Sequence, residues 1–554
     1  MKLSEYVFKR LEDLGIDNVF CIPGESVQEL YRALINSPLN NILLSHEPSA
    51  GYATDAYSRL KGIGAVLVSY GVGSLNMVNA VSQAYAESSP MIVLSGGPGM
   101  AERKKYSLLH HKVRTFQTQQ RVFDEITAAS LIIESPEEAA IKLETAFQTA
   151  LRYKKPVYVE IPRDICNCKI GAQPILSQFD EDYDADTVKE ALEEVVELLN
   201  KAQKPVILAG VEVSRIKMQD KLIEFIEKTG LPVCTTLLGK SLVSESHPQS
   251  LGTFFGTLSN KAAGHYLESS DLILSLGSIL SDVNLGMFTF QFDRTKMIEA
   301  RIDHLRVKHH HYPEMTLKNC IQGLLEHKNI KKRNIDIPKP RKSHIAKEIP
   351  SERITVNNAE TVLNKFINRD NTPTYRIVSD VGDCLFLTQG LHTNTISSFL
   401  SPAYYLSMGF AVPGGIGAQI ADPSQRSLIV VGDGAFQMTG MEIISATRLG
   451  LNPIIVVLNN GVYATLDKVE LDPLPESYKI GKYEYFKMAE IFGGIGLKAD
   501  TTDEFEKALN KAEKKHSNDL VLIQLNLDEN DVSDVLKSFG AKMGQSNQEA
   551  SSIE

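Results

Sequence analysis

The sequence predicts an α/β fold of three doubly wound domains, each built around a parallel β-sheet. At 554 residues the chain is too long for a single hydrophobic core, and about three domains is the natural expectation. Short apolar runs alternate with helical patterns along the chain, an order typical of parallel sheets covered by helices. We place the domains at 1–170, 186–328 and 354–543, with a polar, disordered tail at 544–554.

Three regions of this alternation can be distinguished. In the first, we expect apolar strands at 19–22, 42–44, 65–68, 91–94 and 157–161. In the second, we expect them at 205–209, 231–234 and 271–276. The third region begins with a strand at 376–380. The middle region has Rossmann-like strands but lacks a Gly-x-Gly-x-x-Gly pattern after them, so no nicotinamide or flavin site is expected there.

The stretches between these regions are expected to be linkers. Residues 177–184 form an exposed connector, and 328–353 is basic and punctuated by proline. The basic stretch could instead be a nucleic-acid-binding patch. The net charge of −10 favours a solvated linker and argues against nucleic acid as the main partner.

The other bulk properties indicate a cytoplasmic protein. No apolar run is long enough to span a bilayer, and the first residues lack the apolar core of a signal peptide. The six cysteines are scattered, and the close pair Cys166 and Cys168 has no second pair to complete a zinc site. We therefore expect reduced thiols and no contact with membranes.

One motif in the third region points to a metal site. An apolar run ends in Gly432-Asp433-Gly434-Ala435, a helical segment follows, and a second apolar run ends in Asn459-Asn460. Parallel βαβ connectivity brings the carboxyl ends of both strands to one edge of the sheet, where ligands of open α/β folds bind. Asp433 and Asn460 suit Mg²⁺, which keeps few protein ligands and takes the rest from phosphate and water.

The small residues of the motif would let a diphosphate approach the backbone and the next helix. A lone Gly-Asp-Gly could equally be a plain βα turn with a helix cap. The asparagine pair at the end of the following strand disfavours that alternative. This combination is the thiamine diphosphate-binding motif, and the chain resembles that enzyme superfamily.

The resemblance extends from residue 1 to about 540 and is specific to one subgroup. The stretch from Leu109 to Thr127 and the stretch Ser379–Phe386 are similar to pyruvate, indolepyruvate and phenylpyruvate decarboxylases, and look closest to the bacterial phenylpyruvate decarboxylases. The resemblance implies a pyrimidine-binding, a middle and a diphosphate-binding domain. It also implies a homodimer, or dimers paired into a homotetramer, with the cofactor between chains.

The resemblance assigns catalytic roles to residues of the first domain. Glu47 would hydrogen-bond the aminopyrimidine of thiamine diphosphate and favour the imino tautomer that activates the thiazolium carbon. Glu25, His110 and His111 would handle protons around the reacting carbon, work that suits an imidazole near neutral pH. By themselves, the glutamates could be ordinary helix-start residues. The adjacent histidines could be metal ligands or, more simply, surface residues.

It also assigns cofactor contacts in the third domain. Asp383 would lie on the aminopyrimidine side, and the carbonyl of Leu406 would accept from the pyrimidine amino group. Met408 would wedge the two rings into a bent conformer, although a methionine in this turn could be simple core filler. The Val462 carbonyl would join Asp433 and Asn460 as a metal ligand.

Two departures from the subgroup pattern bear on the reaction. Leu466 stands where pyruvate decarboxylases have a glutamate, and the resemblance implies that Asp282 of the middle domain takes part instead. The leucine favours an aromatic or long-chain 2-oxo acid over pyruvate. Glu25 replaces an aspartate, and its extra methylene could slow the protonation that follows loss of carbon dioxide.

Three functions are therefore weighed. The first is non-oxidative decarboxylation of a 2-oxo acid to an aldehyde. The second is a carboligase that uses an aldehyde acceptor to form an acyloin or a 2-hydroxy-3-oxo acid, which slow protonation at Glu25 would favour. The third is a non-enzymatic descendant of the fold, which the presence of Glu47, Asp433 and Asn460 disfavours.

Overall fold

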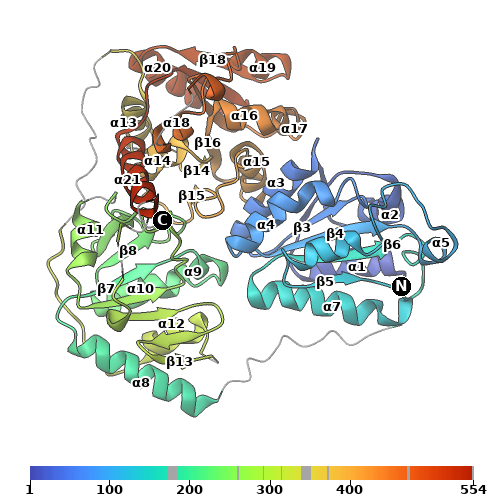
Figure 1. Ribbon diagram of the computed structural model, residues 1–554, viewed down its shortest axis with the longest axis horizontal. Coiled ribbons are helices and arrows are strands. Elements are labelled where there is room, and N and C mark those ends of the chain that lie inside the picture. The colour runs from blue at the N-terminus through green and yellow to red at the C-terminus, as the bar shows by residue number, and fades with distance from the viewer. Residues whose placement is uncertain are drawn as a thin grey trace. The chain divides into compact units, whose positions relative to one another are not determined.

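The computed structural model describes residues 1–171, 184–258, 261–287, 289–290, 292–313, 315–338, 351–370, 373–470 and 475–551 (Figure 1). The chain divides into two compact units. Unit 1 comprises Met1–Asp182 with Pro413–Asp422, and unit 2 comprises Tyr183–Val412 with Pro423–Glu554. The predicted connector at 177–184 lies outside the described residues except for its last residue. The predicted linker at 328–353 is outside them from 339 to 350.

Unit 1 is built on a six-stranded parallel sheet in the order β2-β1-β3-β4-β6-β5. Its strands are β1 (Asn18–Cys21), β2 (Asn40–Leu43), β3 (Gly64–Val68), β4 (Met91–Gly97), β5 (Ser130–Ile132) and β6 (Val157–Pro162). Its helices are α1 (Leu3–Asp13), α2 (Gln28–Ile35), α3 (Glu47–Lys61), α4 (Val78–Ala86), α5 (Met100–Lys105), α6 (Thr118–Asp124) and α7 (Pro136–Tyr153).

Helices cover both faces of this sheet, as the doubly wound prediction requires (Figure 1). Apolar residues of α1, α2 and α7 share one core with alternate strand residues such as Val19, Leu67 and Val159. Helices α3 and α4 pack together, and α3 packs against β1 and β3. Glu47 is the first residue of α3, so packing of this helix fixes where the Glu47 backbone lies.

The middle sheet belongs to unit 2 and is mixed rather than wholly parallel. Its order is β13-β12-β11-β10-β7-β8-β9, and β12 pairs antiparallel with both of its neighbours. Its strands are β7 (Pro205–Ala209), β8 (Val233–Thr236), β9 (Ser250–Phe254), β10 (Leu272–Leu276), β11 (Met297–Ala300), β12 (Leu305–Val307) and β13 (His310–Tyr312). Its helices are α8 (Ala185–Lys201), α9 (Glu212–Arg215), α10 (Gln219–Thr229), α11 (Lys261–Glu268) and α12 (Leu317–Glu326).

The third sheet is parallel throughout, in the order β15-β14-β16-β17-β19-β18. Its strands are β14 (Tyr375–Ser379), β15 (Phe399–Leu400), β16 (Arg426–Gly432), β17 (Ile454–Asn459), β18 (Ile495–Ala499) and β19 (Val521–Asn526). The helices of this part of the chain are α13 (Val356–Ile367), α14 (Asp383–Gln389), α15 (Ala411–Ala421), α16 (Asp433–Thr439), α17 (Ile443–Arg448), α18 (Ala464–Val469), α19 (Phe486–Ile491), α20 (Thr502–Lys514) and α21 (Asp534–Ser551). Of these, α15 falls almost wholly within unit 1.

The prediction of three α/β regions is confirmed, with two differences in detail. The antiparallel edge of the middle sheet was not expected, because β11, β12 and β13 are only three or four residues long and give little periodic signal. At the C-terminus, residues 544–551 continue α21 instead of forming the expected disordered tail. Within the described residues, the helices all lack an apolar stretch long enough to cross a membrane.

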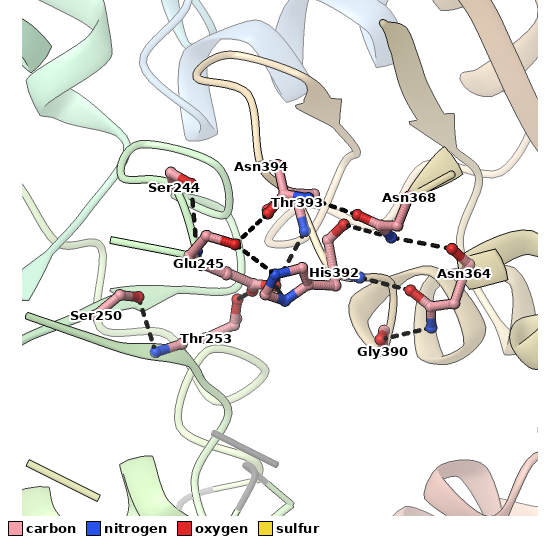
Figure 2. Close-up of polar contacts among 12 residues, drawn as sticks. Ser244, Glu245, Ser250, Thr253, Asn364, Asn368, Gly390, His392, Thr393 and Asn394 are labelled. Carbon is pink, nitrogen blue, oxygen red and sulfur yellow. Dashed lines mark hydrogen bonds and ion pairs between the residues drawn. The ribbon is translucent and has the colours of Figure 1, made fainter. Parts of the chain in front are cut away.

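A buried polar cluster joins the middle and third sheets within unit 2 (Figure 2). Glu245 Oε1 accepts hydrogen bonds from Lys240 Nζ at 2.7 Å and from Thr253 Oγ1 at 3.0 Å. Its Oε2 accepts from the main-chain N–H of Thr393 at 3.1 Å and lies 3.4 Å from His392 Nδ1. The main chains of Glu245 and Thr393 are joined by a second bond of 2.9 Å. Two segments far apart in sequence are thereby fixed to one carboxylate.

The charge on Glu245 is stabilised by this cluster. Burial alone would raise its pKa, but the Lys240 ammonium and the hydrogen bond with His392 lower the pKa to about 2. The pKa of Glu245 is lower in the folded state than its unfolded value of about 4.3. The ionised carboxylate therefore contributes its full share to the free energy of unfolding above a pH of about 4.3. This contribution is lost as the pH falls toward 2.

We expect Glu245→Gln to lower the free energy of unfolding of unit 2 by about 3–5 kcal/mol, because it leaves the Lys240 ammonium buried without its anion. Urea denaturation followed by circular dichroism measures this. The matched control is Glu197→Gln on α8, whose solvent-exposed pair with Lys201 should contribute little to stability. Equal denaturation midpoints for the two variants would contradict the structural role of Glu245.

Candidate active site

The carboxyl ends of β14, β16 and β17 meet at one edge of the third sheet. These strands are parallel neighbours, with Ser379 opposite Val430 and Gly432 opposite Leu458. Asp433 follows β16 directly and begins α16, and Asn460 follows β17. The expected meeting of the two side chains at a sheet edge is therefore what parallel pairing produces.

A cavity of about 290 Å³ lies at this edge, within unit 2. All nine residues predicted to contact the cofactor or metal line it: Asp383, Leu406, Met408, Gly432, Asp433, Gly434, Ala435, Asn460 and Val462. Most of the remaining wall is apolar and comes from Val283, Val356, Val381, Leu385, Phe386, Leu458, Ala464, Leu466, Leu527 and Phe539. The volume and mostly apolar lining are those of a small-molecule site.

Asp433 brings a buried carboxylate to this cavity. Its Oδ1 accepts from the main-chain N–H of Gly434 at 2.9 Å, and its Oδ2 accepts from that of Gly461 at 2.6 Å. Burial raises the pKa of Asp433 to about 6, although these main-chain donors act in the opposite direction. The carboxylate is thus oriented by the backbone, and among the described residues no charged partner stabilises its ionised form.

The two asparagines after β17 have different surroundings. Asn459 is buried, and its Nδ2 donates to the carbonyl of Tyr483 at 3.1 Å. Asn460 lines the cavity, and its Oδ1 accepts from the main-chain N–H of Val462 at 3.1 Å. An amide oxygen accepts two hydrogen bonds or ligands, and the described residues use only one of these at Asn460 Oδ1, so the other can serve a cation.

The charges of the cavity fit a metal-bound diphosphate. Asp383 and Asp433 line it, and its lining contains no lysine, arginine or histidine among the described residues. An anionic ligand therefore needs a cation of its own in this cavity. The described part of the chain has no group of three or more His, Cys, Asp or Glu side chains that could hold a metal without help from a ligand. One carboxylate, one amide and main-chain oxygens are a ligand set that Mg²⁺ accepts.

Glycine is required at position 434 for a packing reason. A Cβ on Gly434 would overlap the ring of Tyr463, which also lines the cavity. The sequence interpretation gave the small side chain a different purpose, close approach of a diphosphate. A larger residue here would force the Tyr463 ring to move, so local packing by itself already favours glycine.

The structure adds two supporting residues that the sequence did not identify. Asp383 Oδ2 accepts from the main-chain N–H of Ser533 at 2.8 Å, and Asp383 Oδ1 accepts from the Ser533 hydroxyl. Fully buried Asp380 accepts from the main-chain N–H groups of Gly409 at 3.1 Å and Ala411 at 2.8 Å. Asp380 ends the expected strand at 376–380, and that position was the available signal.

The turn that carries Leu406 and Met408 is held in an uncommon backbone conformation. Leu406 has φ of 61°, in the left-handed region that leucine seldom adopts, and Gly409 has φ of 85°. The Leu406 N–H donates to the Pro402 carbonyl at 3.0 Å, and Asp380 fixes the far end of the turn. Both side chains line the cavity as a result.

Asp282 is not among the residues that line this cavity. Its carbonyl accepts from the main-chain N–H groups of Met287 at 2.7 Å and Leu285 at 3.1 Å, within a turn of the middle region. The adjacent Val283 does line the cavity. The predicted participation of Asp282 in catalysis therefore stays a prediction.

In unit 1, Glu47 has a defined polar partner. The carboxylate Oε2 accepts from Asn76 Nδ2 at 2.9 Å, and the same amide nitrogen lies 3.1 Å from His46 Nε2. Glu47 is half-buried at the start of α3, after β2. The helix terminus favours the negative charge of the side chain.

The structure brings Glu25 and His110 together and adds Arg163. Glu25 Oε2 lies 2.8 Å from His110 Nε2, and Glu25 Oε1 accepts from Arg163 Nη1 at 2.6 Å. His111 packs edge-on against His110, with ring centres 4.8 Å apart. His111 has φ of 65°, and a Cβ on Gly71 would come within 2.6 Å of its Cβ. Gly71 therefore leaves the space that the histidine pair needs.

Comparison with known proteins identifies the family of the chain. Three thiamine pyrophosphate enzyme family models match: the N-terminal TPP binding domain over 1–125, the central domain over 192–327 and the C-terminal TPP binding domain over 380–525. Indole-3-pyruvate decarboxylase of Azospirillum brasilense is 34% identical over 518 residues, which cover 92% of this chain and 93% of that protein. Pyruvate decarboxylase of Hanseniaspora uvarum is 29% identical over 545 residues, 96% of each chain. Pyruvate decarboxylase isozyme 2 of Saccharomyces cerevisiae is 28% identical over 548 residues, 95% of each.

We expect Asp433→Ala to weaken Mg²⁺-dependent binding of thiamine diphosphate by more than about 100-fold, the upper range for loss of a mere supporting residue. Isothermal titration with and without EDTA measures this, and metal removal from the unaltered protein should have a similar effect. Asp503→Ala, which removes an exposed carboxylate of α20, is the control. Native affinity in Asp433→Ala would exclude Asp433 as a metal ligand.

Proposed function

This chain belongs to the thiamine diphosphate-dependent 2-oxo acid decarboxylase group, and from that premise we propose that it decarboxylates an aromatic or long-chain 2-oxo acid. The products are the corresponding aldehyde and carbon dioxide, without net oxidation. The observation that carries this proposal is the cavity beside Asp433, where a magnesium-type ligand set borders a largely apolar wall.

The residues of unit 2 would hold the cofactor. Asp433, Asn460 and the carbonyl of Val462 are proposed as the Mg²⁺ ligands, and Met408 as the apolar support for the two rings. Leu406 would offer its carbonyl to the aminopyrimidine. Thiamine diphosphate, when bound, supplies the carbon nucleophile and the electron sink for loss of carbon dioxide.

The character of the wall supports a large apolar substrate. Leu466 lines the cavity where pyruvate decarboxylases have a glutamate, and Phe386 and Val462 are among the other lining residues. Leu466 is 43% exposed, so a substrate side chain could cover apolar surface that is now open to water. A small substrate such as pyruvate would leave that surface uncovered.

The residues of unit 1 would set the protonation state of the cofactor and substrate. Asn76 donates to Oε2 of Glu47, and Oε1 of Glu47 would bind the aminopyrimidine. Glu25, His110 and His111 would handle the proton that replaces carbon dioxide on the substrate carbon. Glu47 and Asp433 belong to different units. The resemblance implies that they act on one cofactor from two chains, so we propose a homodimer, or paired dimers.

Carboligation is the second candidate function. Glu25 stands where the related decarboxylases have aspartate, and Arg163 holds its carboxylate. If that arrangement slows proton delivery, the reactive carbon left after loss of carbon dioxide stays unprotonated for longer. It can then attack an aldehyde acceptor and form an acyloin. Both functions use the same cofactor and the same first half-reaction.

A product assay distinguishes the two functions. With phenylpyruvate, indolepyruvate, branched 2-oxo acids and pyruvate as substrates, we expect free aldehyde, with the highest kcat/KM for the aromatic or long-chain acids. The apolar wall should favour each additional buried methylene by about 0.8 kcal/mol, or roughly fourfold. A preference for pyruvate would contradict the proposed substrate class, and acyloin as the main product with an added aldehyde would favour carboligation.

We expect Glu47→Gln to retain fold and cofactor binding but to lower turnover by about 100- to 10,000-fold, the usual contribution of a positioned acid–base group. Glutamine matches glutamate in shape but cannot carry the charge that favours the imino tautomer. Exchange of the thiazolium proton, followed by NMR, should slow to a similar degree. Exchange at the unaltered rate would show that Glu47 is not the activating group.

The same variant reports on assembly. Mixed Glu47→Gln and Asp433→Ala chains should recover part of the activity if one cofactor site takes Glu47 from one chain and Asp433 from another. Recovery requires exchange of subunits, which size-exclusion chromatography with tagged chains verifies. Verified exchange without recovered activity would contradict the shared site.

A further inference from the structure

Arg163 contacts the residues proposed to handle protons. It follows β6, and its main-chain N–H donates to the carbonyl of Gly97 at 3.0 Å. Its guanidinium Nη1 donates to Glu25 Oε1 at 2.6 Å, while Glu25 Oε2 lies 2.8 Å from His110 Nε2. One carboxylate is thus held between a guanidinium and an imidazole that come from two different loops.

The guanidinium is oriented by contacts on its other side. Arg163 Nε donates to Glu102 Oε2 at 2.9 Å, and Arg163 Nη2 donates to Glu102 Oε1. Glu102 also accepts from the main-chain N–H of Gly99 at 2.8 Å, and Asp164 accepts from that of Met100 at 3.0 Å. The two parallel bonds between Arg163 and Glu102 need the paired N–H groups of an arginine, and they fix the plane of the guanidinium before any ligand binds.

The length of Glu25 is what allows its double contact. Its two oxygens face different partners, and both contacts are at hydrogen-bonding distance. An aspartate would withdraw the carboxylate by about 1.5 Å, one carbon–carbon bond. It could then meet Arg163 or His110, but both only if the backbone moved.

Electrostatics agrees with this geometry. The hydrogen bond from Arg163 is the main reason why the pKa of Glu25 lies below its ordinary value; burial opposes it, and the charges of His110 and Arg163 add to it. The same guanidinium lowers the pKa of Glu102. An ionised carboxylate accepts a hydrogen bond from an imidazole and orients it, but has no proton to give at neutral pH.

We propose that Arg163 is a positioning residue for the reaction: it fixes the Glu25 carboxylate against His110, and the extra methylene of Glu25 is the length that serves both partners. In this proposal Arg163 acts through Glu25 and not on the substrate or the cofactor. The catalytic meaning of this inference rests on the proposed decarboxylase function, whereas the contact itself can be tested without cofactor.

The first test uses the cofactor-free protein. The chain has 13 histidines, so labelling their ring Cε1 with carbon-13 gives few NMR signals, and His110→Gln identifies the His110 signal. Arg163→Gln and Glu25→Gln should each move that signal, and the double variant should match Glu25→Gln alone. Arg32→Gln, which removes an exposed arginine paired with Glu29, should leave it in place.

The second test uses the loaded enzyme. Arg163→Gln should lower kcat for aldehyde release by about 10- to 100-fold, the range expected when a reacting group is misplaced by about 1 Å. KM should change little, because a residue that only positions Glu25 adds nothing to substrate binding; a large rise in KM would indicate that Arg163 binds the substrate instead. Arg163→Lys restores the charge but not the two-bond contact, so its kcat should lie between those of Arg163→Gln and the unaltered enzyme.

The outcomes separate the inference from the function on which it rests. An unaltered enzyme that releases no aldehyde from any 2-oxo acid would overturn the proposed function, while the His110 signal still tests the contact. An active enzyme in which Arg163→Gln moves neither the signal nor kcat would overturn the inference. A third variant, Glu102→Gln, removes the contact on the other side of Arg163. If it lowers kcat as much as Arg163→Gln does but leaves the His110 signal in place, Arg163 only holds its loop together and does not position Glu25.

Discussion

Asp433 enters its cavity from the end of β16 with a buried carboxylate and both oxygens tied to main-chain N–H groups. Because no basic side chain lines the cavity among the described residues, the ionised form lacks a protein counter-charge there. The parallel sheet fixes where this charge lies, and the neighbouring strand supplies the amide of Asn460. The ligand must therefore bring its own cation, which relates the strand order directly to the cofactor class.

The two units use the same architecture in opposite ways. In unit 2 the polar groups after the strands are buried, few and oriented by the backbone, as a site for a tightly held cofactor requires. In unit 1 Glu25 and His110 are 51% and 60% exposed, and their order comes from ion pairing with Arg163. In the proposed function, these exposed groups would exchange protons with substrate and solvent.

Sequence reasoning located the strand-end motifs because they combine local signals with a simple rule of parallel pairing. Asp433 and Asn460 each follow a strongly apolar run, so their meeting could be derived. Asp380, Ser533 and Arg163 could not be identified as supporting residues in this way. Ser533 reaches Asp383 from a segment 150 positions away, and Arg163 reaches Glu25 from one 138 positions away, so no local pattern links the partners. The antiparallel edge of the middle sheet was missed because its strands are too short to show periodicity.

Leu406 has a consequence for engineering this enzyme toward thermal stability. A leucine at φ of 61° carries a conformational cost of about 1–2 kcal/mol, which glycine at the same place would largely avoid. Consensus or stability-guided redesign would therefore tend to choose glycine, or to remodel the turn between Pro402 and Gly409. Such a variant would gain heat resistance in the isolated protein while losing the fixed direction of the Leu406 carbonyl and the Met408 side chain. At Leu406, a change that raises heat resistance thus disturbs the shape of the cavity, and selection for heat resistance alone would replace this residue.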